Sequence, residues 1–332
     1  CICPFGRGGV QMSSITYISI FAKDIDNYIQ FKCSMGYSKS TYDNALKRFD
    51  RFCAENFPDA NSITEDIAIA WSEKRNNESE NSRIRRMITL KGFTDYLAAT
   101  GIETYVFPKG FIGQYRPFHP YLYGQDELAR FFRGADTLPV HPVAKNRELI
   151  APVIFRMHLC CGLRPQETLA LKRDDVNLAN SSIYIADTKV HKDRVVAMSP
   201  DLCRLCELYE DKISSRIPER KFYFQRTQED VPLTALWQER LFAVCAQNAG
   251  LHFQKGNKPC VYSFRHNFAT LVIKKWFAEG KDIASMLPVL SGYMGHTSLE
   301  DTAYYIHLVP EHLTNTGLIS WNCIPEVPAY ED

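Results

Sequence analysis

The segment Gly295-His296-Thr297-Ser-Leu-Glu-Asp-Thr-Ala-Tyr-Tyr-Ile-His307 contains two adjacent tyrosines, the second of which lies nine residues after His296. Thr297 and Glu300 fit the N-cap and N3 positions of a capping box, so we expect a helix that starts there and carries both tyrosines. A tyrosine hydroxyl is a weak nucleophile near neutral pH because its pKa is near 10. It becomes reactive when neighbouring groups align an electrophile and neutralise the charge that develops. One of the two tyrosines can instead be buried without a chemical role.

Length and composition are those of an ordinary globular protein. The chain has 332 residues, of which 45% are hydrophobic and 23% charged, enough for two domains and a sizeable core. It contains no long apolar run and no apolar secretory segment at its start, so we expect no membrane partner. The eleven cysteines are scattered without a pairing pattern, which favours reduced thiols in a cytoplasmic protein. Cys203 and Cys206 have a metal-type spacing, but no second pair accompanies them, so we predict no metal site.

The pattern of elements divides the chain into a helical N-terminal part and a mixed C-terminal part. Residues 14–101 show four apolar stripes at helical spacing, which predicts a compact helical domain. Residues 102–121 are interrupted by prolines and glycines, so we expect a linker between two domains. Residues 122–313 combine helices with a hairpin, and the predicted fold class is mainly α with a small antiparallel β-sheet. Residues 1–13 are interpreted as a leader or remnant, and residues 314–332 as a C-terminal tail.

A second informative stretch, Cys161-Gly-Leu-Arg-Pro-Gln-Glu167, joins two predicted helices. Gly162 can end the first helix, and Pro165 suits the first turn of the second. Arg164 therefore projects from the junction, with Glu167 close enough to orient its guanidinium. The planar fork of an arginine matches a phosphate, but such a pair is also common as a purely structural ion pair.

Two short strand-like segments, 182–186 and 194–198, predict a β-hairpin with a polar tip. Lys189 lies at this tip, where its ammonium group could donate a proton to a leaving alkoxide in a neighbouring groove. Lys192 shares the tip and is the alternative donor. A solvated turn lysine without chemistry is the other interpretation.

Tyr262-Ser-Phe-Arg265 opens a helix that we expect to end at Gly280. Arg265 falls in its first turns, where the positive end of the helix dipole favours an anion. Tyr262 lies about one turn earlier on the same face. Two arginines with a local signature therefore precede the tyrosine segment.

Together these stretches resemble the tyrosine recombinases, also called phage-type integrases. Residues 162–167 are similar to that family's first arginine motif, residues 188–189 to its hairpin lysine motif, and residues 264–270 to its second arginine motif. Gly295-His296, followed by Tyr305-Ile-His307, is similar to the final motif with the nucleophile. The resemblance covers about residues 125–310. It implies an α+β catalytic domain preceded by a helical core-binding domain that clamps DNA.

The resemblance also implies a role for each motif residue. Tyr305 rather than Tyr304 would be the nucleophile that forms a 3′-phosphotyrosyl bond with DNA, because it has the family's spacing to both flanking histidines. The other residues implied at the catalytic site are Arg164, Lys189, Arg265, His296, Tyr262 and, in support of Arg164, Glu167. The resemblance implies that no metal ion, ATP or other cofactor is required.

The expected partners are double-stranded DNA recombination sites and further copies of the chain. A basic segment of the N-terminal domain and residues beside the hairpin tip would contact DNA: Arg83, Arg85, Arg86, Lys91, Lys192 and Arg194. The resemblance implies a tetramer on paired DNA sites, with residues 314–332 packing on a neighbouring copy. The implied function is integration, excision or transposition of a mobile element in the bacterial cytosol.

Two departures from the family pattern matter. Tyr262 stands where the family usually has a histidine, and a tyrosine cannot exchange a proton near pH 7. The interval between Arg265 and His296 is longer than usual, so we expect an extended helix and a turn broken at Pro288. The alternatives are a type IB-like topoisomerase or telomere resolvase, and an integrase-like protein that binds DNA with weakened catalysis.

Overall fold

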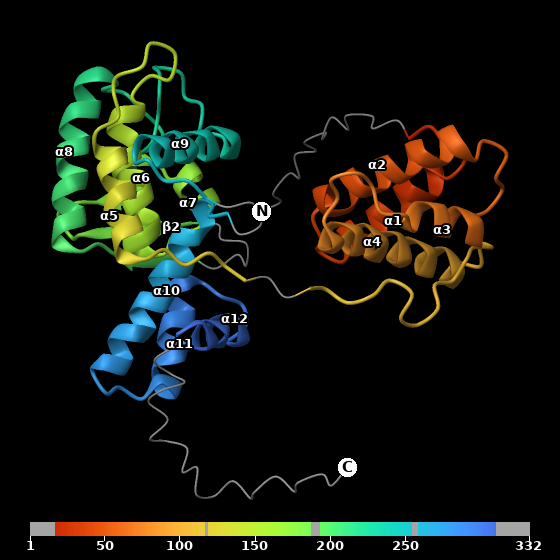
Figure 1. The fold of residues 1–332 in the computed structure, drawn as a ribbon. Helices are drawn as coiled ribbons and strands as arrows, with labels where there is room; N and C mark the ends of the chain where they lie inside the picture. The colour runs from red at the N-terminus through yellow and green to blue at the C-terminus, as the bar shows by residue number, and fades with distance from the viewer. Residues whose placement is uncertain (1–16, 117–118, 187–192, 254–257, 310–332) are drawn as a thin grey trace, which may run out of the picture. The chain divides into compact units, whose positions relative to one another are not determined.

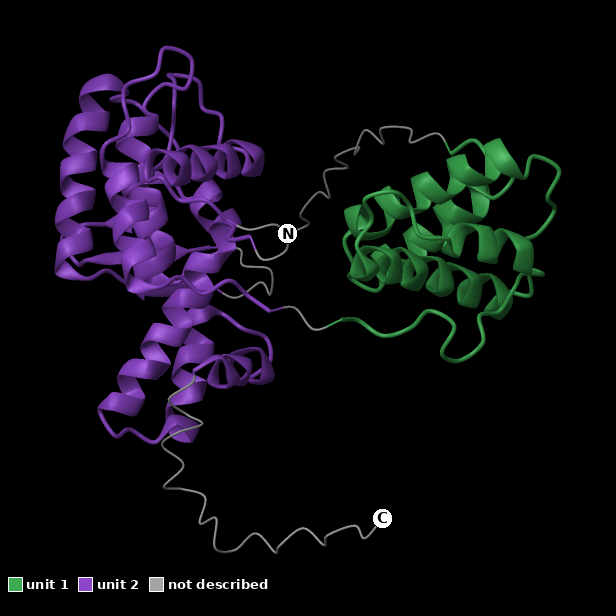
Figure 2. Ribbon diagram, in the orientation of Figure 1, with its two compact units in different colours: residues 1–118 green, residues 119–332 purple. Residues whose placement is uncertain are grey.

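The computed structural model describes residues 17–116, 119–186, 193–253 and 258–309. The chain divides into two compact units, residues 1–118 and residues 119–332, which Figure 2 colours separately. Helices predominate in both units, and a small antiparallel sheet completes the second (Figure 1). This confirms the predicted fold class. Among the described residues, no helix is long and apolar enough to cross a membrane.

The first unit is a compact group of helices, as the four apolar stripes predicted. The helices are α1 (Ala22–Ser34), α2 (Lys39–Asn56), α3 (Glu65–Ser72) and α4 (Glu80–Ala99). The hydroxyls of Thr64 and Ser79 cap α3 and α4 by accepting hydrogen bonds from backbone N–H groups. Aromatic side chains fill the core, where Phe49 and Trp71 pack edge to face with ring centroids 5.2 Å apart.

Much of the stretch expected to be a free linker packs on the first unit. Thr104 pairs with Ile63 in an isolated parallel bridge, and the Tyr105 N–H donates to the Ile63 carbonyl. Phe107 is buried in the core of this unit. At the other end, Tyr121 already packs on the core of the second unit. Aromatic residues near each end of the predicted linker therefore bury apolar area on the unit that they adjoin.

The second unit carries the remaining helices of the described chain. They are α5 (Gln125–Asp136), α6 (Arg147–Cys161), α7 (Pro165–Ala170), α8 (Pro200–Arg216), α9 (Ala235–Asn248), α10 (Val261–Ala278), α11 (Ile283–Met294) and α12 (Glu300–Ala303), with 3-10 helices η1 (Arg173–Asp175) and η2 (Tyr304–Leu308). Figure 1 shows α5, α6 and α8 side by side, and α10, α11 and α12 grouped at another end of the unit.

The sheet of this unit has three strands in the order β1-β2-β3, all antiparallel. The strands are β1 (Val176–Asn177), β2 (Ser182–Ile185) and β3 (Arg194–Ala197). The predicted hairpin is confirmed by β2 and β3, where Ile183 pairs with Val196. The first strand, β1, was not predicted, because two residues are too short to show an alternation. The hairpin tip, residues 187–192, lies outside the described residues.

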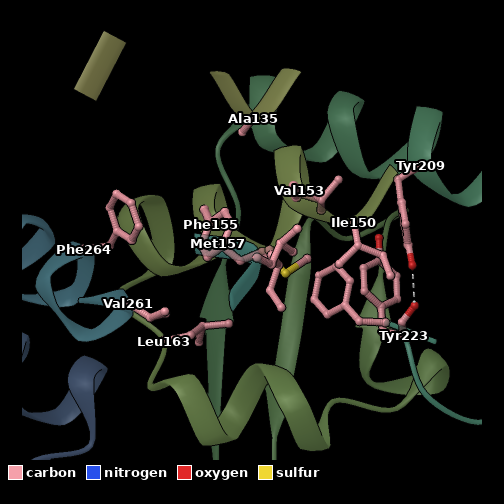
Figure 3. Close-up of a cluster of buried hydrophobic side chains, with 14 of the residues drawn as sticks. Ala135, Ile150, Val153, Phe155, Met157, Leu163, Tyr209, Tyr223, Val261 and Phe264 are labelled. Carbon is pink, nitrogen blue, oxygen red and sulfur yellow. Dashed lines mark hydrogen bonds between the residues drawn. The ribbon is translucent and has the colours of Figure 1, made fainter. Parts of the chain in front are cut away.

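The main core of the second unit forms around α6 (Figure 3). Phe264, in the first turn of α10, packs among the phenylalanine rings of α5, α6 and α9, with its centroid 5.0 Å from that of Phe131. The Tyr209 hydroxyl donates to the Tyr223 carbonyl at 2.8 Å, the dashed line in Figure 3. This core fixes the first turn of α10, and with it the residue that follows Phe264.

A second, smaller core joins α10, α11 and η2. It contains Ile273, Leu290, Met294, Tyr305 and Val309, all buried. Helix α10 therefore has one end in the main core and the other in this smaller core. This arrangement holds the tyrosine segment on the same helix that carries the second arginine.

Two local predictions are wrong. The capping box at Thr297 does not form, since α12 begins only at Glu300 and the Ser298 hydroxyl accepts the Glu300 N–H instead. A helix does carry both tyrosines, and it is the 3-10 helix η2, which follows α12 directly. Pro288 lies inside α11 without ending it: Leu290 and Met294 after the proline pack in the smaller core, and Leu287 before it is also buried.

Candidate active site

A cleft of about 730 Å³ opens where α10, the chain after α11, and η2 meet. Its lining residues come from segments far apart in the sequence: Arg164, Tyr262, His266, His296, Thr297, Glu300, Asp301, Tyr304 and Tyr305. Four of the predicted catalytic residues are among them. Two others, Glu167 and Arg265, have buried side chains that do not line the cleft. Glu167 forms an ion pair with Arg164, and Arg265 donates a hydrogen bond to the backbone carbonyl of Met294.

The C-terminal end of α11 gathers three arginines. The backbone carbonyls of residues 293, 294 and 295 accept hydrogen bonds from Arg194, Arg265 and Arg164, respectively. The last carbonyls of a helix lack intrahelical partners and form the negative end of the helix dipole, so cations are stabilised there. One helix end therefore positions guanidinium groups from β3, α10 and the start of α7.

Arg164 occupies the predicted helix junction. Gly162 ends α6 with a φ of +63°, a left-handed conformation that favours glycine, and a Cβ at this position would overlap the Phe268 ring. Pro165 is the first residue of α7. Glu167 accepts from both the backbone N–H and Nη1 of Arg164, each at 2.8 Å. The predicted pair is present, and it leaves Arg164 at the edge of the cleft.

Glu167 also binds a second arginine, Arg194, through two parallel hydrogen bonds of 2.8 Å. Burial alone would raise the pKa of Glu167, but the hydrogen bonds and charge of Arg194, together with those of Arg164, lower it to about 2. Arg194 was predicted to contact DNA. In the structure its side chain is only 9% exposed, and its guanidinium is held by Glu167 and the end of α11.

Arg265 is fully buried at the floor of the site. It donates to the Gly162 carbonyl and, at 2.7 Å, to the Met294 carbonyl. Burial and the charge of Arg164 lower the pKa of Arg265 to about 10, so it remains a cation at neutral pH. Its Nε has no hydrogen-bond partner in the described part of the chain. A buried cation with an unsatisfied donor favours an anion nearby.

His296 follows the end of α11 and lines the cleft. Its Nδ1 lies 2.7 Å from the Thr302 hydroxyl, which fixes the ring against α12. Burial, followed by the charges of Arg265 and Arg164, lowers the pKa of His296 to about 3. The ring is therefore neutral at pH 7 when no anion balances the arginines.

Tyr305 is the buried member of the tyrosine pair, with 3% of its surface exposed. Its hydroxyl lies 3.0 Å from Nδ1 of His266. Burial raises the pKa of Tyr305 well above the usual range, although the charge of Arg265 opposes the increase. Tyr304 also lines the cleft but is less buried. Both tyrosines can thus reach a substrate in the cleft, and their contacts differ.

His266 is a cleft residue that the sequence reasoning missed. It follows Arg265 directly and lies one turn after Tyr262 on α10, with the two rings 4.9 Å apart. Its place four residues after Tyr262, on the same face of the predicted helix, was the available signal. The distance to Tyr305 could not be inferred without the fold.

The sequence reasoning also missed a buried histidine next to the α6–α7 junction that carries Arg164. His158 is fully buried, and its Nδ1 lies 2.9 Å from the Leu163 carbonyl. Its Nε2 lies 2.9 Å from Nε2 of Gln238, so we assign Nδ1 as the donor and Nε2 as the acceptor. Burial lowers the pKa of His158 to about 4. The network holds the backbone immediately before Arg164.

The remaining predicted residues lie elsewhere. Lys189 and Lys192 fall outside the described residues. Of the basic residues of α4, which were predicted to contact DNA, Arg86 is buried, pairs with Glu78 and contacts the Trp71 ring. The other three belong to the first unit as well: Arg83 pairs with Glu80, Lys91 pairs with Asp95, and Arg85 is exposed. Within the described ranges, no cluster of three or more His, Cys, Asp or Glu could hold a metal ion.

Comparison with known proteins identifies the family. Residues 125–312, more than half of the chain, match the profile of the phage integrase family. The chain belongs to the phage integrase family. Residues 26–101 match the N-terminal SAM-like domain of phage integrases, so each of the two units contains a region that matches a phage integrase domain. The predicted resemblance to tyrosine recombinases is confirmed.

Individual phage integrase relatives agree with this assignment. The chain is 26% identical over 300 residues to the putative integrase/recombinase y4rB of Sinorhizobium fredii, covering 89% of this chain and 95% of the relative. It is 26% identical over 292 residues to tyrosine recombinase XerD of Bifidobacterium longum, covering 77% of this chain and 88% of the relative. Relatives of this kind support a recombinase enzyme.

Solved structures share the fold. XerH site-specific recombinase bound to its palindromic difH substrate, in a post-cleavage complex, matches with a TM-score of 0.64 and 22% identity over 83% of this chain and 77% of that chain. The Tn1549 transposon integrase in complex with transposon right end DNA matches with a TM-score of 0.62 and 15% identity over 88% and 97%. At this identity the similarity establishes the fold of the phage integrase family.

Proposed function

We propose that this phage integrase family member is a site-specific DNA recombinase that supports integration, excision or transposition of a mobile element. It would cut and rejoin strands through a 3′-phosphotyrosyl bond at Tyr305. The observation that carries the proposal is the cleft in which the buried Tyr305 lies with Arg164 and His296, above Arg265. A tyrosine, a histidine and two arginines around one cavity suit a phosphodiester better than any uncharged substrate.

The chemistry follows from the charges. Attack of the Tyr305 oxygen on phosphorus builds negative charge on the non-bridging oxygens. Arg164, Arg265 and His296 would stabilise that charge, and removing one such donor typically costs about 100-fold or more in rate. The 5′-oxygen leaves and takes a proton, for which Lys189 is the proposed donor. The phosphotyrosyl bond retains the energy of the phosphodiester, so rejoining needs no ATP, and these residues supply the charge that a metal ion would otherwise provide.

A bound phosphodiester would also change the histidine. Burial, followed by the charges of Arg265 and Arg164, lowers the pKa of His296 in the free protein, where no phosphate lies between the arginines. A phosphate anion between them removes that repulsion and raises the pKa again. His296 could then donate a proton or a charged hydrogen bond to a non-bridging oxygen.

For DNA binding by the first unit we propose a basic cleft instead of the whole α4 stretch. This cleft, of about 290 Å³, is lined by residues of α2, α3, α4 and the connection between α3 and α4, among them Arg48, Arg75 and Arg85, all exposed. Arg75 stacks on the Trp71 ring at 4.3 Å, which presents its guanidinium at the surface. Several relatives with this fold were solved as DNA complexes. We further propose a tetramer on paired sites, with residues 314–332 packing in trans.

The proposal is tested by covalent capture. The protein is incubated with a library of nicked duplexes with randomised arms, and complexes that survive denaturing detergent are isolated and sequenced. We expect one enriched site and a protein–DNA adduct that is lost in Tyr305→Phe and kept in the matched variant Tyr304→Phe. An adduct that persists in Tyr305→Phe, or none from the wild-type protein, overturns the assignment. Plasmid relaxation without strand exchange by the active protein would instead support a topoisomerase.

A further inference from the structure

We propose that His266 is the catalytic base that removes the proton of the Tyr305 hydroxyl during attack on DNA. The inference rests on the proposed function and adds to it a residue whose role neither the sequence motifs nor the family assignment provides. Every attack by a tyrosine needs an acceptor for the phenolic proton. The question is which group of this cleft is placed to be that acceptor.

The geometry points to His266. Its Nδ1 lies 3.0 Å from the Tyr305 oxygen, within the reach required of a general base. Both side chains line the cleft, and their rings are 5.7 Å apart at an angle of 49°. Among the described residues, this is the hydrogen bond that the Tyr305 hydroxyl makes. The base and the nucleophile come from α10 and η2, which the smaller core holds together.

The position of His266 also compensates for the histidine that the family usually has where this chain has Tyr262. The resemblance places a histidine at position 262, where a phenol cannot accept a proton near neutral pH. Residues 262 and 266 are one helical turn apart and share a face of α10. The imidazole that is missing at one position is therefore present at the next position on the same face, nearer to η2.

Other groups around Tyr305 are less suitable. His296 stacks beside the tyrosine with ring centroids 6.2 Å apart, but its Nδ1 is directed to Thr302. Asp301 and Glu300 line the cleft as carboxylates, and the charge of Asp301 raises the pKa of Tyr305. A carboxylate next to the phosphate would repel it, whereas a neutral imidazole does not.

The electrostatic setting keeps His266 neutral before the reaction. Burial and the adjacent charge of Arg265 lower its pKa to about 4, so its lone pair is available at pH 7. The phosphodiester brings one negative charge into the cleft, and a further charge develops as the tyrosine attacks. These charges offset Arg164 and Arg265, so the basicity of His266 increases as the proton is transferred.

The step is balanced as written. The O–H bond of Tyr305 breaks, and its proton moves to the His266 lone pair. The phenolic oxygen forms a bond to phosphorus, and the electrons of the P–O5′ bond leave with the 5′-oxygen. His266 becomes an imidazolium, which returns the proton to Tyr305 when a 5′-hydroxyl attacks the phosphotyrosine.

The test measures single-turnover cleavage of the nicked duplex obtained by covalent capture, at saturating protein. His266→Asn keeps a hydrogen-bonding atom near the Nδ1 position but cannot take up a proton, and His141→Asn is the matched control outside the cleft. Each protein is assayed with the normal 5′-oxygen and with a 5′-bridging sulfur, whose thiolate leaves without a proton. We expect His266→Asn to cleave about 100-fold more slowly with both substrates. DNA affinity in a mobility-shift assay and the rate of His141→Asn should match the wild-type protein.

Two further variants make the result specific. Lys189→Ala, the proposed acid, should regain its rate with the sulfur substrate, whereas His266→Asn should not. Adding Tyr262→His to His266→Asn should restore at least about tenfold of the lost rate, since it returns an imidazole to the same helix face. If His266→Asn melts below the wild-type protein, His266→Gln replaces it in the same assays.

The outcomes separate the two proposals. Cleavage by His266→Asn within threefold of the wild-type rate overturns the role of His266 and leaves the proposed function intact. Recovery of His266→Asn by the sulfur substrate also overturns it, because the defect would then lie in the leaving group. Failure of the wild-type protein to form any adduct overturns the proposed function and, with it, this inference.

Discussion

Glu167 is the residue on which the geometry of the cleft depends. A single buried carboxylate binds both Arg164 and Arg194, and each arginine in turn binds a carbonyl at the end of α11. A buried charge is tolerated only when it is paired and hydrogen-bonded, so the loss of one partner affects the other two. Arg194 thus acts on Arg164 through Glu167, as a positioning residue.

The first prediction concerns Arg194. Arg194→Gln leaves Glu167 with one cationic partner, so we expect the free energy of unfolding of the second unit to fall by about 3 kcal/mol. Urea denaturation followed by tryptophan fluorescence and circular dichroism measures the change. Arg204→Gln, an exposed arginine of α8, is the matched control and should change the free energy by less than about 0.5 kcal/mol. Equal effects of the two substitutions would contradict the role of Arg194.

The second prediction concerns pH. The pKa of His158 is lowered from 6.5 to about 4, so between these values the unfolded chain binds a proton that the folded chain does not. The free energy of unfolding is therefore constant above pH 6.5 and falls by about 1.4 kcal/mol per pH unit below it, for this histidine alone. His266 and His296 add in the same direction. Glu167, whose pKa is lowered from 4.5 to about 2, weakens the fold only below pH 4.5.

Urea denaturation between pH 8 and pH 4.5 tests this pH dependence. We expect His158→Gln to reduce the slope below pH 6.5, and His141→Asn, which changes a histidine outside this network, to leave it unchanged. A wild-type stability that does not vary over this range would contradict the assignment of buried neutral histidines.

The elements of the second unit meet at their ends. Gly162 terminates α6 and Gly295 follows α11, both in the left-handed conformation, and their carbonyls bind Arg265 and Arg164. Helix ends are usually satisfied by water or by local side chains. Here guanidinium groups from distant segments take that place, so helix termination and the site are formed by the same contacts.

The third prediction compares two glycines with similar backbone angles. Gly162 has a φ of +63° and an added Cβ would overlap Phe268, whereas Gly280 has a φ of +67° and no atom within 4 Å of such a Cβ. Gly280→Ala should cost about 1 kcal/mol, the strain of the left-handed conformation alone. Gly162→Ala should cost at least about 2 kcal/mol more, because the Phe268 ring must move. Thermal and urea unfolding measure both values, and equal costs would refute the overlap.

Sequence patterns predicted those elements that are determined locally. The junction at Gly162 and Pro165 and the strands of the hairpin have signals within a few residues, and the structure confirms them. The start of α12 is set by the choice of Ser298 over Thr297 as the acceptor of a backbone N–H, and the continuation of α11 through Pro288 accompanies its packing on the smaller core. Local propensity is overridden at Pro288.

The candidate site likewise combines residues that the sequence could identify with residues whose contacts only the fold reveals. Motif residues such as Arg164 and His296 could be identified because their types and spacing resemble a family. The roles of Arg194 and His266 depend on contacts with Glu167 and Tyr305 that only the fold brings together. A basic residue near a hairpin tip gives no sign in the sequence that its charge is already paired.

Each unit contributes a different part of the proposed binding. The second unit holds the cleft with the tyrosine, and the first presents the basic cleft around Arg48, Arg75 and Arg85. Contacts to phosphates release counterions, so the affinity for DNA depends on salt in proportion to their number. The contribution of the first unit can therefore be measured without knowledge of the recombination sequence.

The fourth prediction follows for Arg85. Arg85→Ala should weaken binding to any duplex and reduce the slope of log affinity against log salt by about 0.9, the value for one phosphate contact. Fluorescence anisotropy with a labelled duplex at several salt concentrations gives the slope. Lys23→Ala removes the same charge from α1, away from the basic cleft, and should leave the slope unchanged. Identical slopes for Arg85→Ala and the wild-type protein would exclude the contact.

The packing of residues 104–116 on the first unit determines where two integrases can be joined into a chimera. A junction at the predicted domain end, near residue 101, would separate Phe107 from the core that buries it and Arg116 from Asn81, to which it is hydrogen-bonded. A foreign first unit would then have to accommodate aromatic side chains that it did not evolve with. Exchanging the chain up to residue 116 transfers these contacts intact, so the DNA contacts proposed for the first unit and the strand cleavage proposed for the second can be recombined and tested as separate modules.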